Sequence, residues 1–186
     1  MNAQINTSDL RSAETVDGMP GHAAAAVTDG TQFISFTIGD ESYGVDIMAV
    51  REIKVWSEIT RLPEQPAFVR GVLNLRGAIV PIVDLRCRFG QGLTEATALH
   101  VVIIVQIDGQ LVGLLADRVS DIVTVDPTKI KPVPKIGQNS KSAFLSGIVS
   151  IESELIALIE LSRLLSLPEA AALAASAESD KAGQAA

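Results

Sequence analysis

The chain has 186 residues, of which 47% are hydrophobic and 4% aromatic, and its formal net charge is −7. The ends carry most of that charge. Residues 1–31 hold four acids and one cation, and residues 168–186 hold three acids and one cation, so residues 32–167 have a net charge of only −2. Proteins that bind nucleic acid usually present a basic face, with aromatic side chains where bases stack. The composition therefore argues against a nucleic-acid partner.

Cysteine usage and hydropathy exclude two further classes of protein. Cys87 is the single cysteine, so neither an internal disulfide nor a zinc site made of several thiolates is expected. The N-terminus lacks the pattern of a signal peptide, and no apolar run approaches the roughly 20 residues of a membrane span. We therefore expect a cytoplasmic protein that does not insert into a membrane and that needs no metal or other cofactor.

Residues 1–31 are rich in Ala, Thr, Ser, Gly and Asp without a sustained period, which predicts a disordered N-terminal arm. Short β-rich patterns then predict five strands in the first half, at 33–38, 42–45, 50–56, 69–75 and 78–83. Asp84 is placed to cap one helical turn that follows the fifth strand. Five short strands are enough to close a small barrel without exposed sheet edges.

The second half of the chain repeats this plan. Strands are predicted at 101–107, 111–116, 120–125, 145–151 and 154–159, with a proline-bearing loop at 129–139 and a helical turn after Glu160. Strands without long intervening helices favour antiparallel sheets over a βαβ fold. Pro168 opens an Ala-rich C-terminal tail, residues 168–186, which is expected to be partly helical over 169–177.

The two halves also resemble each other residue by residue. GVLNLRGAIVPIVD at 71–84 is echoed by GIVSIESELIALIE at 147–160, a spacing of 76, and YGVDIMAVREI at 43–53 is echoed by VGLLADRVSDI at 112–122, a spacing of 69. Similar segments in the same order predict two similar small domains. We expect one barrel over about 32–90 and another over about 99–167, and the pattern leaves open whether they exchange end strands.

Residues that usually carry catalysis are few and isolated. His22 lies in the predicted arm, His100 stands alone before an apolar strand, and Cys87 lies between two arginines after another apolar strand. A nucleophile needs a base and an orienting group within reach. No phosphate-binding, dinucleotide-binding, metalloprotease or serine-hydrolase motif occurs. A small β-barrel enzyme or ligand-binding protein that uses Cys87 or His100 is therefore the less favoured hypothesis.

Arg76 is the strongest candidate for a functional side chain. It lies in the segment NLRG at 74–77, where Asn74 and a Gly77 of positive φ are expected to bracket a tight turn. The second half has SIES at 150–153 in that place, so the duplicated fold alone does not require an arginine. Glu52 shares a strand face with Val50. Each charge is either a solvated surface residue or part of a polar rim beside a docking groove, and periodicity alone does not decide.

Several of these segments together resemble the CheW family, whose members couple chemoreceptors to the histidine kinase CheA in bacterial chemotaxis. The resemblance covers about residues 32–167. It is carried by FTIGDESYGVDIMAVREI at 36–53, PAFVRGVLNLRGAIVPIVDLR at 66–86, DRVSDIVTV at 117–125 and FLSGIVSIESELIALIEL at 144–161. The resemblance implies an all-β fold of two tandem five-stranded SH3-like β-barrels with short helices, and a non-enzymatic adaptor function.

The resemblance also implies where partners bind. In the family, a groove between the barrels receives the helical tip of a methyl-accepting chemoreceptor, and the barrels contact the regulatory domain of the kinase. Carried over to this chain, the receptor-facing residues are Val50, Glu52, Ile53, Gly71, Asn74, Leu75 and Arg76. The kinase-facing residues, on the loop before the last hairpin, are Lys131, Lys135 and Ile136.

The resemblance further implies a location in the cell, and the length of the chain distinguishes among the family's relatives. An adaptor of this kind is expected in the cytoplasm, recruited to membrane-associated receptor arrays. CheA has phosphotransfer and ATP-binding domains, and CheV adds a receiver domain of about 120 residues. A chain of 186 residues leaves room for neither. The favoured hypothesis is a chemotaxis adaptor, and the alternative is a paralogue that serves a pilus or another non-flagellar chemosensory array.

Overall fold

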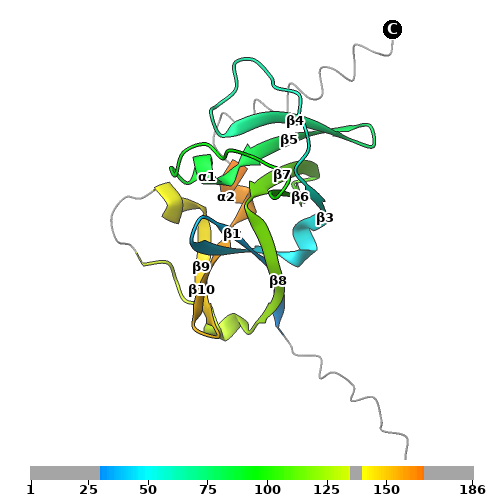
Figure 1. Cartoon of the computed structure of the whole chain (residues 1–186). Coiled ribbons are helices and arrows are strands. Elements are labelled where there is room, and N and C mark those ends of the chain that lie inside the picture. The colour runs from blue at the N-terminus through cyan, green and yellow to red at the C-terminus, as the bar shows by residue number, and fades with distance from the viewer. Residues whose placement is uncertain (1–29, 135–139, 166–186) are drawn as a thin grey trace, which may run out of the picture.

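The computed structural model describes residues 30–134 and 140–165, and its described part is mostly β-structure (Figure 1). The strands are β1 (Thr31–Ile38), β2 (Glu41–Asp46), β3 (Val50–Val55), β4 (Val69–Leu75), β5 (Ala78–Asp84), β6 (Val101–Ile107), β7 (Gln110–Ala116), β8 (Arg118–Val125), β9 (Leu145–Ile151) and β10 (Glu154–Ile159). The short helices are α1 (Leu85–Arg88) and α2 (Leu161–Leu165), and the 3₁₀ turns are η1 (Ile47–Ala49), η2 (Pro127–Lys129) and η3 (Ser140–Phe144). The predicted C-terminal tail, and the predicted arm up to residue 29, lie outside the described residues.

The predicted strands and helical turns are confirmed. All ten strands are present, and β4, β6, β9 and β10 have the predicted bounds. The helical turns α1 and α2 follow β5 and β10, as expected. Asp84 caps α1, because its carboxylate accepts a hydrogen bond from the backbone N–H of Cys87 at 3.1 Å. Local patterns of strand, turn and cap were therefore sufficient to place these elements.

The strands form two five-stranded sheets, in the orders β8-β1-β2-β10-β9 and β3-β6-β7-β5-β4. The second sheet uses five consecutive strands, and we call it the inner barrel. The first sheet uses two strands that precede the inner barrel and three that follow it, and we call it the split barrel. In Figure 1 the split barrel lies below the inner barrel. Each sheet combines strands from both halves of the sequence.

The expectation of antiparallel sheets holds for most strand pairs but not for all, because each sheet contains one parallel pair. β2 pairs in parallel with β10 in the split barrel, and β5 pairs in parallel with β7 in the inner barrel. The sequence pattern specifies each hairpin, whose strands are antiparallel because a short turn joins them. It does not specify how one hairpin lies against another, and here hairpins meet with their inner strands running in the same direction.

The two sheets are related to each other by the internal repeat. Gly44 of β2 lies opposite Leu158 of β10, and Gly113 of β7 lies opposite Ile82 of β5. These two pairs are equivalent under the sequence spacings of 69 and 76. A Cβ atom on Gly113 would come within 3.0 Å of the Ile82 side chain, and one on Gly44 would lie 3.0 Å from Leu158. Both parallel junctions therefore use a glycine to let a large apolar side chain approach.

Closure of each barrel is made by the segment that follows its edge strand. In the inner barrel the backbone of Thr60, beyond β3, exchanges hydrogen bonds of 2.8 and 2.9 Å with Val72 of β4. In the split barrel, Lys131, beyond β8, exchanges two hydrogen bonds of 2.8 Å with Ile148 of β9. The edge strands β4 and β9 are thereby paired at one position each, which leaves less unpaired edge available for aggregation.

A shared apolar core holds the two barrels together. Its buried side chains come from both sheets and from both short helices, and they include Phe36, Tyr43, Leu85, Ile103, Leu114 and Leu164. Each barrel also has a smaller cluster of its own, around Val80 and Ile104 in the inner barrel and around Val149 and Leu158 in the split barrel. The barrels are therefore parts of one packed body.

Candidate functional site

The β4–β5 hairpin tip presents Arg76 on an unusual backbone. Both turn residues have positive φ, 52° at Arg76 and 90° at Gly77, and the backbone N–H of Gly77 donates to Oδ1 of Asn74 at 2.8 Å. The positive φ of Gly77 confirms the sequence prediction. A positive φ at a non-glycine residue is uncommon and costs energy, and the Arg76 side chain is 83% exposed. The tip is therefore a tight turn that leaves the guanidinium exposed.

Strand β3 brings two further charges to this tip. Nη2 of Arg76 lies 3.3 Å from Oε2 of Glu52, and Nζ of Lys54 lies 3.8 Å from Oε1 of the same carboxylate. Sequence reasoning selected Glu52 and Arg76 but missed Lys54. The available signal was its position two residues after Glu52, since residues i and i+2 of a strand lie on the same face. The structure thus assembles a cluster of one acid and two bases.

Exposed apolar side chains occur on the same elements as the charged cluster. Ile53 and Val55 of β3 are 41% and 61% exposed, and Ile79 of β5 is 45% exposed. The Arg76–Glu52 contact shows that β3 and the hairpin tip lie next to each other. We call these two elements together the candidate docking region. Ile53 and Val55 alternate along β3 with Glu52 and Lys54, so the two pairs lie on opposite faces of the strand. Apolar area with charges nearby is the usual composition of a protein–protein contact.

The predicted receptor-facing residues divide between this surface and the interior. Glu52, Ile53, Asn74 and Arg76 are accessible, whereas Leu75 is buried in the inner-barrel cluster and Val50 packs against the shared core. Gly71 is buried, with φ of 140°, and faces the backbone of Thr60. These interior residues could influence a partner only by supporting the surface residues, and their contact with a receptor stays a prediction.

The split barrel provides an internal comparison for the docking region. The repeat places Asp121, Val123 and Glu152 where the inner barrel has Glu52, Lys54 and Arg76, so a formal charge of +1 becomes −2. The apolar positions are kept, because Ile122 and Leu155 stand in place of Ile53 and Ile79 and are 53% and 66% exposed. The barrel fold therefore accommodates the exposed apolar pair without the basic cluster.

Only part of the predicted kinase-facing set can be placed. Lys131 is exposed and pairs through its backbone with Ile148 of β9. Its position next to β9 is equivalent to that of Thr60 next to β4 in the inner barrel. Lys135 and Ile136 lie outside the described residues. A contact between this loop and a kinase stays a prediction.

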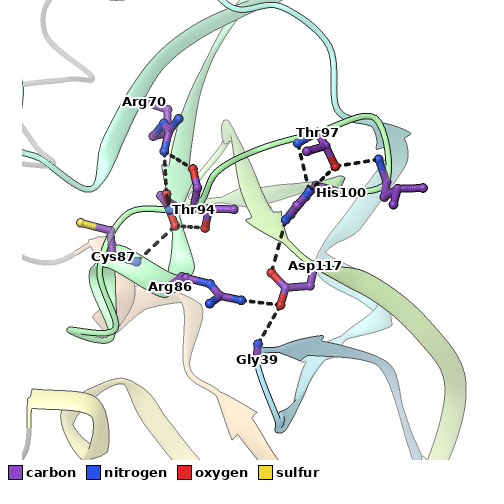
Figure 2. A network of polar contacts seen from close by, with 10 residues as sticks. Gly39, Arg70, Arg86, Cys87, Thr94, Thr97, His100 and Asp117 are labelled. Carbon is purple, nitrogen blue, oxygen red and sulfur yellow. Dashed lines mark hydrogen bonds and ion pairs between the residues drawn. The ribbon is translucent and has the colours of Figure 1, made fainter.

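The residues of the enzyme hypothesis do not form a catalytic arrangement. Burial raises the pKa of the Cys87 thiol, and the negative charge of Asp84 raises it further, whereas a nucleophilic cysteine needs a lowered pKa. Nδ1 of His100 accepts a hydrogen bond from the backbone N–H of Thr97 at 3.0 Å, and Figure 2 shows His100 turned toward Asp117 and away from Cys87. No group of three metal-ligating side chains occurs among residues 30–134 and 140–165.

Buried Asp84 instead organises the loop between α1 and β6. Its carboxylate accepts hydrogen bonds from the N–H and the hydroxyl of Thr94, at 2.8 and 2.7 Å, and forms an ion pair of 3.0 Å with Arg70. Arg70 also donates to the carbonyl oxygen of Thr94 at 2.7 Å (Figure 2). A fully buried charge needs such partners. Asp84 is therefore a structural residue of the inner barrel.

Comparison with known proteins agrees with this architecture. The family model of the CheW-like domain matches residues 32–169. The chain is 45% identical over 141 residues to chemotaxis protein CheW of Rhizobium meliloti (strain 1021), a match covering 75% of this chain and 91% of that protein. It is 37% identical over 147 residues to chemotaxis protein CheW of Klebsiella aerogenes, covering 79% and 89%.

A solved structure shows the same fold. The crystal structure of scaffolding protein TtCheW from Thermoanaerobacter tengcongensis superimposes with a TM-score of 0.70 at 34% identity, covering 80% of this chain and 96% of that one. Among the helices that the structure describes, none is long and apolar enough to cross a membrane.

The fold defines a class: a non-enzymatic scaffold made of two related β-barrels, one of which carries an exposed cluster of charges. The match over residues 32–169 then settles the family. This chain is a member of the CheW family, the chemotaxis adaptor proteins.

Proposed function

We propose that the protein couples the signalling tips of methyl-accepting chemoreceptors to a CheA-type histidine kinase. Family membership and the chemotaxis proteins among its relatives support this proposal. The observation that carries it is the asymmetry between the barrels. The inner barrel has an exposed cluster of Glu52, Lys54 and Arg76, and the equivalent positions of the split barrel hold no cation.

The proposed receptor contact uses the candidate docking region. A helical receptor tip would cover Ile53 and Ile79, and burial of apolar area would supply most of the affinity. Arg76 lies on a tight turn, and its guanidinium offers several directed donors to acidic or carbonyl groups of the partner. Glu52 and Lys54 would fix the register of the helix rather than add much affinity.

The rest of the proposal concerns the kinase and the place of action. The loop with Lys131, Lys135 and Ile136 is our candidate for the kinase contact, and Lys131 is exposed as such a contact requires. The protein acts in the cytoplasm, where it is recruited to membrane-associated receptor arrays through the receptor tip. Its effect on the kinase is one of placement, because the chain itself transfers no phosphate.

Reconstitution of the kinase reaction tests this function. The purified chain is mixed with a CheA-type kinase and a receptor signalling fragment from the same cell, and the rate of kinase phosphorylation is measured. We expect receptor-dependent stimulation that disappears when this chain is omitted. Kinase binding without stimulation would indicate a paralogue that serves a pilus or another array. Binding to neither protein would refute the proposal.

A pair of matched variants locates the contact. Arg76→Ala removes the exposed guanidinium, and Glu152→Ala truncates the equivalent tip residue of the split barrel. We expect stimulation per folded molecule to fall for Arg76→Ala and to stay near that of the parent for Glu152→Ala. An equal effect of the two variants would remove the candidate docking region from the proposal.

A further inference from the structure

A polar network around Asp117 lies where the chain crosses from one barrel to the other. Asp117 follows β7, the middle strand of the inner barrel, and precedes β8, an edge strand of the split barrel. Its backbone N–H donates to the carbonyl oxygen of Thr37 in β1 at 3.1 Å. The residue therefore belongs to both barrels, and its side chain is well placed to connect them.

The Asp117 carboxylate receives donors from elements of both barrels. Oδ2 accepts from the backbone N–H of Gly39, in the β1–β2 turn of the split barrel, at 2.7 Å. The same oxygen accepts from Nη2 of Arg86, in α1 after the inner-barrel strand β5, at 2.7 Å. Figure 2 shows these contacts converging on Asp117. Both bonds are short, as expected of hydrogen bonds to a charged group.

His100 adds a third group from the inner barrel. The Thr97 N–H donates to Nδ1 of His100, so the ring proton of the neutral imidazole lies on Nε2. Nε2 is 3.7 Å from Oδ1 of Asp117, and within the described residues that buried oxygen has no hydrogen-bond partner. The histidine is thus positioned by Thr97 to face the remaining oxygen of the carboxylate.

The other crossing between the barrels has no such network. The chain first passes from the split barrel to the inner barrel at η1. This turn contains Met48, which is equivalent to Asp117 at the spacing of 69. Met48 is 77% exposed. The shared apolar core joins the barrels, but apolar contact has no preferred direction, whereas hydrogen bonds to a carboxylate are directional. The network is therefore an addition at one crossing and not a requirement of the repeat.

We propose that Asp117 is the positioning residue that sets the relative orientation of the two barrels through Gly39 and Arg86, with His100 as its third contact. Asp117 touches no partner in this role. On the basis of the proposed function, the orientation matters because an adaptor places the receptor contact of one barrel at a defined angle to the kinase contact of the other.

The orientation can be measured without either partner. Val55→Cys in β3 and Thr124→Cys in β8 introduce two cysteines at exposed positions that are equivalent at the spacing of 69. Spin labels on these cysteines report the distance between the barrels. Cys87 is replaced by Ala in this background. We expect Asp117→Asn to shift or broaden the distance distribution while circular dichroism shows that the barrels stay folded. An unchanged distribution would overturn the proposal.

Further variants separate positioning from a general loss of stability. Asp126→Asn is the matched control, because the Asp126 carboxylate accepts hydrogen bonds from the N–H and the hydroxyl of Thr128, within η2 of the split barrel. It should leave the distance unchanged, and a change as large as that of Asp117→Asn would overturn the proposal. Arg86→Gln should reproduce the effect, Arg86→Lys should partly restore it, and Arg86→Gln combined with Asp117→Asn should add little.

Kinase activation tests the consequence for function. Unlabelled Asp117→Asn should still bind the receptor fragment and the kinase separately, with reduced receptor-dependent stimulation. Full stimulation despite a changed distance would overturn the functional half of the inference. If the parent chain itself fails to stimulate the kinase, the proposed function fails, and the distance measurement still decides the role of Asp117.

Discussion

Gly71→Ala tests how the inner barrel is closed beneath the candidate docking region. A Cβ atom at this position would come within 3.0 Å of the carbonyl oxygen and carbon of Thr60, which are backbone atoms and cannot rotate away. Its φ of 140° is also unfavourable for alanine. Both hydrogen bonds between Thr60 and Val72 would be lost if the closing segment moved aside.

The magnitude follows from these contributions. Backbone strain of this kind costs about 1–3 kcal/mol, and each lost hydrogen bond costs about 1 kcal/mol net. The expected loss is therefore about 3–5 kcal/mol. At about 2–4 °C per kcal/mol for a chain of this size, the melting temperature should fall by at least roughly 6 °C. Urea unfolding followed by the fluorescence of Trp56 measures the loss. Trp56 is the single tryptophan, and it packs against the inner-barrel cluster.

Two matched variants separate the cost of backbone strain at Gly71→Ala from the cost of its steric clash with Thr60. Gly77→Ala places alanine at φ of 90° with no atom beyond its chain neighbours within 4 Å of its Cβ, so its loss of stability reports the backbone strain alone, about 1–3 kcal/mol. Gly147→Ala, at the equivalent position of the split barrel, meets chiefly the side chain of Ile130, which can shift. Gly71→Ala should be the most destabilising of the three. A loss within about 1 kcal/mol of that of Gly77→Ala would refute the claim that Thr60 is held against Gly71.

Three further predictions concern named side chains. Arg76→Ala should lower the free energy of unfolding by less than about 1 kcal/mol, because its ion pair with Glu52 is solvent-exposed; a much larger loss in urea unfolding would make Arg76 structural. Asp84→Asn should cost about 3 kcal/mol, because it leaves Arg70 without its anionic partner. Hydrogen exchange at the Thr94 amide should accelerate in that variant, and unchanged protection would contradict the role of Asp84. The pKa of the Cys87 thiol is raised in the folded state. The contribution of this thiol to the free energy of unfolding is therefore complete below its unfolded-state pKa and is lost as pH rises through its folded-state pKa. Stability should therefore fall less steeply in alkali for Cys87→Ala, and a thiol reagent should react with the folded parent more slowly than with the unfolded chain.

Local elements could be predicted from the sequence because their signals are local. Alternation of apolar residues, the Asp-Gly turn at 108–109 and the Asp84 cap each depend on a few neighbouring residues, and all of them appear in the structure. The parallel junctions could not be predicted in this way. Gly44 and Leu158 meet across more than a hundred residues, and hairpin patterns carry no information about that pairing.

The candidate site shows the same division. The turn at Arg76 and Gly77 was predicted from four adjacent residues, and the repeat showed that the arginine is not needed for the fold. The contact of Lys54 with Glu52 depends on side-chain placement, and the network around Asp117 joins segments that are far apart in the chain. Neither has a periodic signature that single-sequence reasoning could use.

In the sequence, the strands of the inner barrel lie between the strands of the split barrel, and this order affects how the chain folds as it is synthesised. The five strands of the inner barrel lie between Val50 and Ala116, so they are all available as soon as that stretch leaves the ribosome. Strands β1 and β2 emerge first but find their neighbours, β8 and β10, only after the inner barrel has been synthesised. We therefore expect the inner barrel to assemble first, and the β1–β2 hairpin to complete its sheet only after β8 and β10 have been synthesised.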